Sequence, residues 1–169
     1  LIASSHGGVS LKDWARPKEL NADTYDKTLY GAMIDRIRKT GGHIAGVLWY
    51  QGESDALRAE DADIYGDRFR DWLKLLRADT RTNLPVVFVQ LGPHRNDAPD
   101  MIKYWMTVQD QQRKLIGEND YTACVTAIDC SLDDKVHISK DGLNILGKRL
   151  AAAAILTKKG DAKNVAPTP

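Results

Sequence analysis

The sequence has little of several features that mark specialised classes of protein. Its 169 residues include two cysteines, Cys124 and Cys130, which are too few for a disulfide framework or a cysteine metal site. The formal net charge of +1 gives no reason to expect nucleic acid or an anionic membrane as a partner. No apolar run reaches the roughly 18 residues of a membrane span, and the first residues show no signal-peptide pattern.

What is present is typical of a globular domain. Hydrophobic residues make up 43% and charged residues 28% of the chain, a composition that supplies a core, and the length fits one domain. We expect that domain to span residues 1–157, with residues 158–169 as a linker or disordered tail because they are small, polar and proline-containing. Cys124 lies in an apolar run and is predicted to be a buried free thiol.

Short apolar runs alternate with longer amphipathic ones. The runs are continuously apolar, as in parallel strands covered on both faces, and they span Leu1–Ser4, His43–Tyr50, Pro85–Leu91 and Tyr121–Ile128. Helical spacing occupies about residues 25–40, 65–80, 101–116 and 141–156; Gly41 and Gly42 end the first helix, Gly117 ends the third, and the second ends before Asn83 and Pro85. This order predicts a three-layer α/β/α sandwich around a parallel sheet with right-handed crossovers.

Ligand sites of such sheets lie at the carboxyl ends of the strands. Four loops are therefore candidates: HGGVSLKDW after the first apolar run, QGESDA after the second, LGPHRNDAPD after the third and DCSLDDKVHISKDG after the fourth. In the third, His94 and Arg95 could recognise a substrate carboxylate or hydroxyl, or the loop is simply solvated.

The fourth loop contains an acid three residues before a histidine. Asp134 could fold back to accept the Nδ1 proton of His137, leaving the other ring nitrogen free as a base. Ser139 is the expected cap of the helix that follows. The alternative is a surface loop with an incidental histidine.

The first loop contains Gly7 and Gly8, which allow the backbone to approach a ligand and turn its N–H groups toward an oxyanion. The alternative is a simple tight turn, and His6 is expected to be structural. In the second loop, Gly52 to Ala56 imitates a nucleophile elbow centred on Ser54. A competing interpretation makes Ser54 or Asp55 a helix cap.

Four segments in order, HGGVSLKDW, GVLWYQGESDA, PVVFVQLGP and DDKVHISKDGLNILGKRLA, resemble the conserved blocks of the SGNH-type carbohydrate esterases. The similarity is strongest to the sialate O-acetylesterase and acetylxylan esterase group. It implies a flavodoxin-like α/β/α fold that removes acetyl groups from sugar hydroxyls through a serine nucleophile, without metal or other cofactor. It also implies secretion or a periplasmic location.

The resemblance also assigns roles to residues. His137 matches the general base and Asp134 its orienting acid, Gly8 matches a backbone oxyanion donor beside Gly7, and Gln51 matches a side-chain position in the third block. Glu53 matches a functionally important acid and could support the histidine. The second loop would then be an active-site wall rather than an elbow.

The chain departs from the family pattern at the nucleophile. The family's serine lies in a Gly-Gln-Ser-Asn-type block after a first strand, and no such block occurs here, since Ser4, Ser5 and Ser10 lie around the glycine loop. We therefore expect a partial esterase domain whose first strand and nucleophile lie upstream. The missing segment, or a further domain of the same protein, is an expected partner besides the O-acetylated carbohydrate.

Two alternatives remain open from the sequence. One is a catalytically inactive sugar-binding module, in which Trp14, Trp49 and Tyr50 stack on a sugar. The other is a glycoside hydrolase that uses Glu53 and Asp134 as a carboxylate pair about 5–9.5 Å apart.

Overall fold

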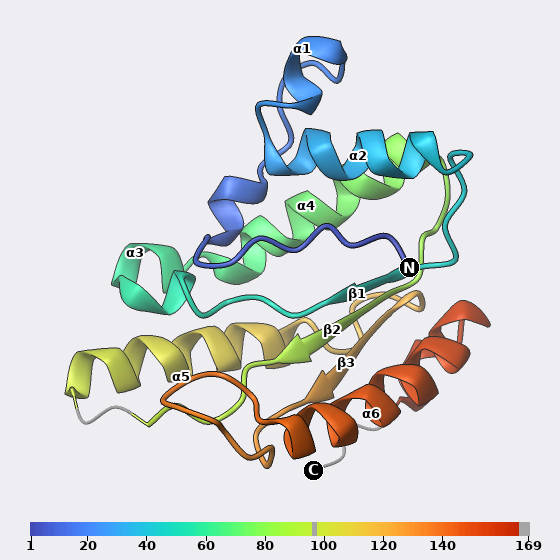
Figure 1. The fold of residues 1–169 in the computed structure, drawn as a ribbon. Coiled ribbons are helices and arrows are strands. Elements are labelled where there is room, and N and C mark those ends of the chain that lie inside the picture. Colours follow the sequence, from blue (N-terminus) through green and yellow to red (C-terminus); the bar gives the residue numbers. More distant parts are fainter. Residues whose placement is uncertain (96–97, 166–169) are drawn as a thin grey trace.

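The computed structural model describes residues 1–95 and 98–165 as one α/β unit (Figure 1). Its strands are β1 (Val47–Trp49), β2 (Val86–Gln90) and β3 (Thr122–Thr126). The helices are α1 (Ala22–Tyr25), α2 (Leu29–Lys39), α3 (Ala59–Ala62), α4 (Tyr65–Thr80), α5 (Pro99–Lys114) and α6 (Lys140–Lys158). Short 3₁₀ helices span Leu11–Trp14, Asp55–Leu57 and Ala162–Asn164.

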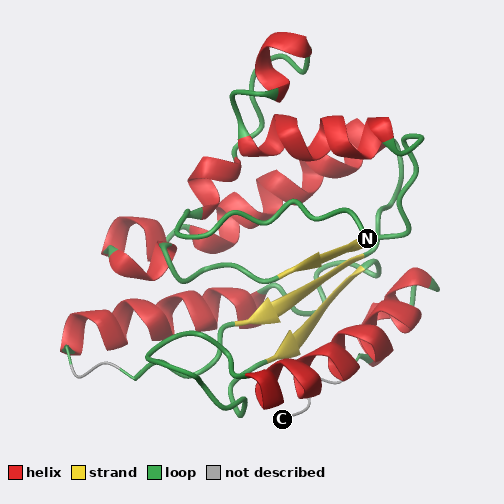
Figure 2. Cartoon of the chain, viewed as in Figure 1, coloured by secondary structure: helices red, strands yellow, loops and turns green. Residues whose placement is uncertain are grey.

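The three strands form a parallel sheet in the order β1-β2-β3. Figure 2 shows α6 on one face of the sheet and α2, α4 and α5 on the other, which confirms the predicted three-layer α/β/α architecture. The predicted strand at Leu1–Ser4 is wrong, because this segment is irregular. No backbone hydrogen bond joins residues 1–9 to β1 within the described chain, so the segment has no ladder to enter.

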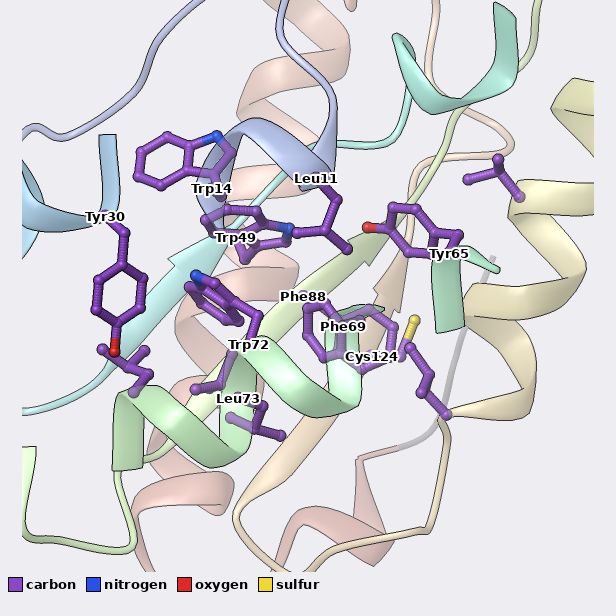
Figure 3. Packing of buried hydrophobic residues seen from close by; sticks show 14 of the residues in the cluster. Leu11, Trp14, Tyr30, Trp49, Tyr65, Phe69, Trp72, Leu73, Phe88 and Cys124 are labelled. Carbon is purple, nitrogen blue, oxygen red and sulfur yellow. The ribbon is translucent and has the colours of Figure 1, made fainter. Parts of the chain in front are cut away.

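Aromatic side chains dominate the core on the α2/α4 face (Figure 3). Trp49 on β1 lies between Trp14 and Trp72, with ring centroids 5.2 Å and 4.3 Å away. Phe69 on α4 contacts Phe88 on β2 at 5.1 Å. Because these rings come from both layers and from the 3₁₀ helix, they fix the amino-terminal segment against the sheet.

The opposite face has a smaller apolar cluster between α6 and strands β2 and β3. Val87, Ala123 and Leu146 are buried there, whereas Leu48, in register with Val87, is 53% exposed. The α6 cover therefore stops short of β1, and the described chain leaves this edge of the sheet open.

The helix boundaries follow the predicted signals. The Ser139 side chain accepts the Gly142 N–H and caps α6 as predicted, and Gly41 and Gly42 follow α2 with positive φ angles. In the segment predicted as a tail, Ala162 is buried against the α6 cluster, so packing continues past residue 157; residues 166–169 lie outside the described chain. Across residues 1–95 and 98–165, no helix combines the length and apolarity needed to cross a membrane.

Candidate active site

The four candidate loops meet at the carboxyl edge of the sheet. The first and second are joined by a hydrogen bond from Gln51 Nε2 to the Val9 carbonyl, 3.3 Å long. The third and fourth are joined by a 2.9 Å bond from the Arg95 N–H to the Lys135 carbonyl. Glu53 in the second loop interacts electrostatically with His137 in the fourth, which links the two halves.

Asp134 and His137 form the contact that their spacing predicts. Asp134 Oδ2 lies 2.6 Å from His137 Nδ1. Asp134 Oδ1 accepts the backbone N–H groups of Val136 and His137, each at 2.8 Å. The carboxylate thus turns the loop and orients the ring with separate oxygens. Since the His137 side chain is 78% exposed, its Nε2 side is open to solvent.

The electrostatics of this pair follow from its hydrogen bonds. The pKa of Asp134 lies well below its ordinary value, mainly because its carboxylate accepts the two backbone N–H groups, and the imidazole adds to this. The hydrogen bond to Asp134 raises the pKa of His137 above 6.5, and the charges of Asp134, Glu53 and Asp133 act in the same direction. The ring therefore becomes a neutral base only above the ordinary histidine range.

Glu53 is the one predicted site acid that lies in a desolvated position. Burial raises its pKa, although backbone N–H groups of Glu53 and Gly52 and the charge of His137 oppose the shift. Gly52 is fixed by its surroundings: its φ is +144°, and a Cβ there would lie 3.0 Å from Gln112 and from Val108. The loop therefore needs glycine at this point to aim Glu53 toward the histidine.

Gln51 is buried, and both hydrogens of its amide are engaged inside the protein. Nε2 donates to Asp55 Oδ2 at 2.5 Å and to the Val9 carbonyl at 3.3 Å. Because the Asp55 carboxylate accepts hydrogen bonds, the nitrogen of the Gln51 amide, rather than its oxygen, must face it. In this arrangement Gln51 ties the first two loops together, and it could donate to an oxyanion only by releasing one of these bonds.

Gly7 and Gly8 are exposed, and nothing lies within 4 Å of a Cβ built at either position. Gly8 has a φ of +72°, so this turn favours glycine. The His6 ring lies 3.1 Å from the Gly7 carbonyl on the surface. The open space around both glycines leaves room for a ligand beside this turn.

Several serines of the chain can be placed by their contacts. Ser10 donates to Asp13, Ser131 is hydrogen-bonded to Ser139, and Ser54 precedes the 3₁₀ helix Asp55–Leu57 without a side-chain capping bond. Neither the Ser54 hydroxyl nor the Asp55 carboxylate acts as the expected cap, because Asp55 points into the protein. Within the described residues, no serine hydroxyl is hydrogen-bonded to His137.

Asp55 is the site residue that sequence reasoning missed. Its side chain is fully buried, and Oδ2 accepts both the Leu11 N–H at 2.8 Å and the Gln51 amide. The amphipathic spacing around it gave no signal, because Leu11 lies 44 positions away in the sequence. The acid joins parts of the first two loops.

The third loop contributes a partly buried histidine. The His94 ring lies 4.4 Å from that of Trp105, and burial lowers the pKa of His94, with the Lys135 charge adding to this. Arg95 is exposed beside the fourth loop. The next two residues of the predicted loop, Asn96 and Asp97, lie outside the described residues.

The structure argues against both alternatives left open by the sequence. Trp14 is 3% and Trp49 7% exposed, so these two rings belong to the core and cannot stack on a sugar; Tyr50 is partly buried. Both oxygens of Asp134 are engaged with its own loop, which removes it as one of a glycosidase pair. No group of three or more His, Cys, Asp or Glu side chains suited to a metal occurs in the described part of the chain.

An Asp–His pair and a glycine turn at the carboxyl edge of a parallel sheet are features of α/β hydrolytic enzymes. The comparisons with known proteins narrow this class. A family described as carbohydrate esterase, sialic acid-specific acetylesterase matches residues 1–156. The chain belongs to this family.

The chain is similar to a probable carbohydrate esterase of Arabidopsis thaliana, with 33% identity over 158 residues. The alignment covers 90% of this chain and 54% of that protein. The X-ray structure of the Arabidopsis protein superposes with a TM-score of 0.71 at 32% identity, over 88% of this chain and 57% of the other.

The structure of a carbohydrate acetylesterase from Xanthomonas citri gives a TM-score of 0.70 at 26% identity, over 91% of this chain and 36% of that one. The chain thus spans about half the length of the curated relative that it matches. These comparisons confirm the sequence-based family resemblance and the fold.

Proposed function

We propose that the protein containing this chain removes acetyl groups from sugar hydroxyls by acyl transfer, with His137 as the general base and Asp134 as its orienting acid. The observation that carries this proposal is the Asp134–His137 pair, held in one geometry by two loop N–H groups, with Nε2 facing solvent. Family membership supports the ester chemistry and the carbohydrate substrate.

The nucleophile in this proposal is a serine hydroxyl supplied from outside residues 1–169. It attacks the acetyl carbonyl while His137 Nε2 takes its proton. The oxyanion forms against the Gly8 N–H and the nucleophile's own N–H; Gln51 joins them if its bond to Val9 opens. His137 then protonates the departing sugar oxygen, and water repeats the sequence to release acetate.

Two observations support an external serine. Among the described residues no serine is hydrogen-bonded to His137, and Leu48 leaves one edge of the sheet apolar and half exposed. A parallel strand beside β1 would end at the same edge as the glycine loop and the histidine. A residue following that strand would therefore lie at the same edge of the sheet as His137.

Substrate choice within this class is also a proposal. Arg95 lies beside the fourth loop and Lys135 lies within it, and no ion pair engages either side chain within residues 1–95 and 98–165. Their charges favour an acidic sugar such as an O-acetylated sialic acid over a neutral xylo-oligosaccharide. Acetate release from the two substrates by the natural full-length protein tests this preference.

The test of the reaction is a His137→Ala variant of the full-length protein, measured by acetate release. We expect activity to be lost, whereas His43→Ala, an exposed histidine before β1 at the opposite end of the sheet, retains it. Equal activity of the His137→Ala variant and the wild type would refute the proposed base.

A further inference from the structure

Asp55 uses one oxygen to hold two loops at once. Its Oδ2 accepts the Leu11 N–H at 2.8 Å and the Gln51 Nε2 hydrogen at 2.5 Å. Since Gln51 also donates to the Val9 carbonyl, a closed ring of contacts runs from Val9 through Leu11, Asp55 and Gln51. Val9 is the residue after Gly8, so this ring sets where the glycine turn lies relative to the second loop.

The ring is anchored to the rigid part of the fold. Arg68 on α4 places Nη1 3.6 Å from Asp55 Oδ1 and 2.6 Å from Asp61 Oδ1. Lys12 Nζ lies 3.0 Å from the other oxygen of Asp61. Because α4 packs its aromatic face into the core, the buried carboxylate transmits the position of this helix to both loops.

A fully buried carboxylate is expensive to retain in a fold unless its contacts are needed. Here its contacts serve no sheet ladder, and both lead to loops that carry predicted oxyanion residues. We infer that Asp55 is a positioning residue, which fixes the Gly7–Gly8 turn against Gln51 and Glu53 for the transition state. This inference rests on the proposed function.

The first measurement uses the full-length protein and separates kcat from KM. We expect Asp55→Ala to lower kcat for acetyl release about 100-fold, the loss typical of a displacement of roughly 1 Å, with little change in KM. Asp55→Asn should keep kcat within about tenfold, since the amide oxygen can accept both bonds. Such a rescue distinguishes positioning from a requirement for charge.

The matched control is Asp79, another hydrogen-bonded carboxylate at the far end of α4. It accepts two bonds from Arg16 and one from Tyr30, so Asp79→Ala also loosens the amino-terminal segment. Asp79 contacts neither the first nor the second loop. We therefore expect the kcat of Asp79→Ala to match that of the wild type at a temperature where both proteins are folded.

A second pair of variants removes the Leu11 donor without replacing Asp55. Leu11 begins a 3₁₀ helix after an extended Ser10, a backbone that proline can adopt, but the proline Cδ replaces the hydrogen that Asp55 Oδ2 accepts and pushes the carboxylate away. Leu11→Pro and Leu11→Ala both lose the leucine side chain, but only proline lacks the N–H. We expect a kcat at least about tenfold lower for the proline variant, on the same positional argument.

Amide hydrogen exchange provides a readout that needs no activity. In Asp55→Ala, exchange should accelerate selectively at Leu11, whose N–H loses its acceptor, whereas a general loss of stability would accelerate all core amides together. Unchanged kcat in both Asp55→Ala and Leu11→Pro, or uniform acceleration of exchange, would overturn the inference. A wild-type protein that releases no acetate would instead refute the proposed function, and the exchange pattern would still decide whether Asp55 holds the loops.

Discussion

Replacing Asp134 by asparagine tests the orientation of the imidazole directly. One oxygen of Asp134 accepts two backbone N–H groups, and the other contacts His137 Nδ1. In Asp134→Asn the remaining oxygen can keep the backbone bonds, which places the amide nitrogen against Nδ1. The ring must then accept at Nδ1 and carry its proton on Nε2, so it can no longer act as a base there.

The expected loss in kcat for the full-length protein is about 10⁴-fold, the loss seen when the orienting acid of a serine-protease triad is replaced by its amide. The fold should not change, because the pair lies on the surface and its backbone bonds remain. A loss far below this value would indicate that Glu53, whose charge also reaches His137, shares the orienting role.

The same substitution has a readout in the chain by itself. The hydrogen bond to Asp134 is the largest cause of the raised pKa of His137, so an NMR titration of the ring in Asp134→Asn should show a lower pKa. If His137 is the proposed base, we expect the acid limb of kcat/KM for the full-length protein above pH 6.5, and we expect it to move to lower pH in any variant that lowers this pKa and keeps activity.

The control for that titration is Asp133→Asn. The Asp133 side chain acts on the His137 ring through its charge and is the smallest named cause of the raised pKa, so its neutralisation should lower that pKa less. An equal fall in both variants would mean that general charge, rather than the 2.6 Å contact, sets the pKa, and the orientation argument would fail.

Three further predictions concern stability and reactivity. Burial raises the pKa of Glu53, so keeping this side chain ionised lowers the stability of the fold above pH 4.5. Glu53→Gln should therefore raise Tm at pH 7 by about 2–4 °C, the effect of roughly 1 kcal/mol. At pH 3, where Glu53 is protonated, the variant should show no gain. Gly52→Ala should destabilise by about 1–3 kcal/mol through crowding, whereas Gly147→Ala, with open space in α6, should stabilise by about 0.5–1 kcal/mol; urea unfolding compares the two. Cys124 and Cys130 are each 3% exposed, and burial raises the pKa of Cys124 to about 12, so a thiol reagent should label them only after denaturation, and rapid labelling of the native chain would contradict this.

Local patterns predicted most of the fold. The signals for β2 and β3 are apolar runs, and the signal for α2, α4, α5 and α6 is helical spacing; both depend only on neighbours in sequence. The boundary signals at Gly41, Gly42 and Ser139 act within one helical turn. The predicted strand at Leu1–Ser4 was wrong for a different reason. A strand needs a hydrogen-bonded partner, and apolar composition alone cannot show that none is beside it in the described chain.

In the site, too, contacts between near neighbours in sequence were predicted and long-range contacts were not. Asp134 and His137 are three residues apart, so the contact follows from spacing, whereas the Leu11–Asp55 bond joins residues 44 positions apart. The burial of Trp14 against Trp49 is equally non-local. Sequence reasoning therefore found the residues with exposed chemistry and missed the residue that holds their loops.

The Asp134–His137 pair is held by its own loop after β3, and the glycine turn is held to the loop after β1 by Asp55. Strands β1 and β3 flank β2, so the two halves start about 10 Å apart, two strand spacings. Glu53, in the loop after β1, interacts electrostatically with His137, in the loop after β3. The sheet therefore sets the spacing of the proposed base and the proposed oxyanion turn, and on the proposed mechanism a small ester bridges them only if both loops stay fixed at their own ends.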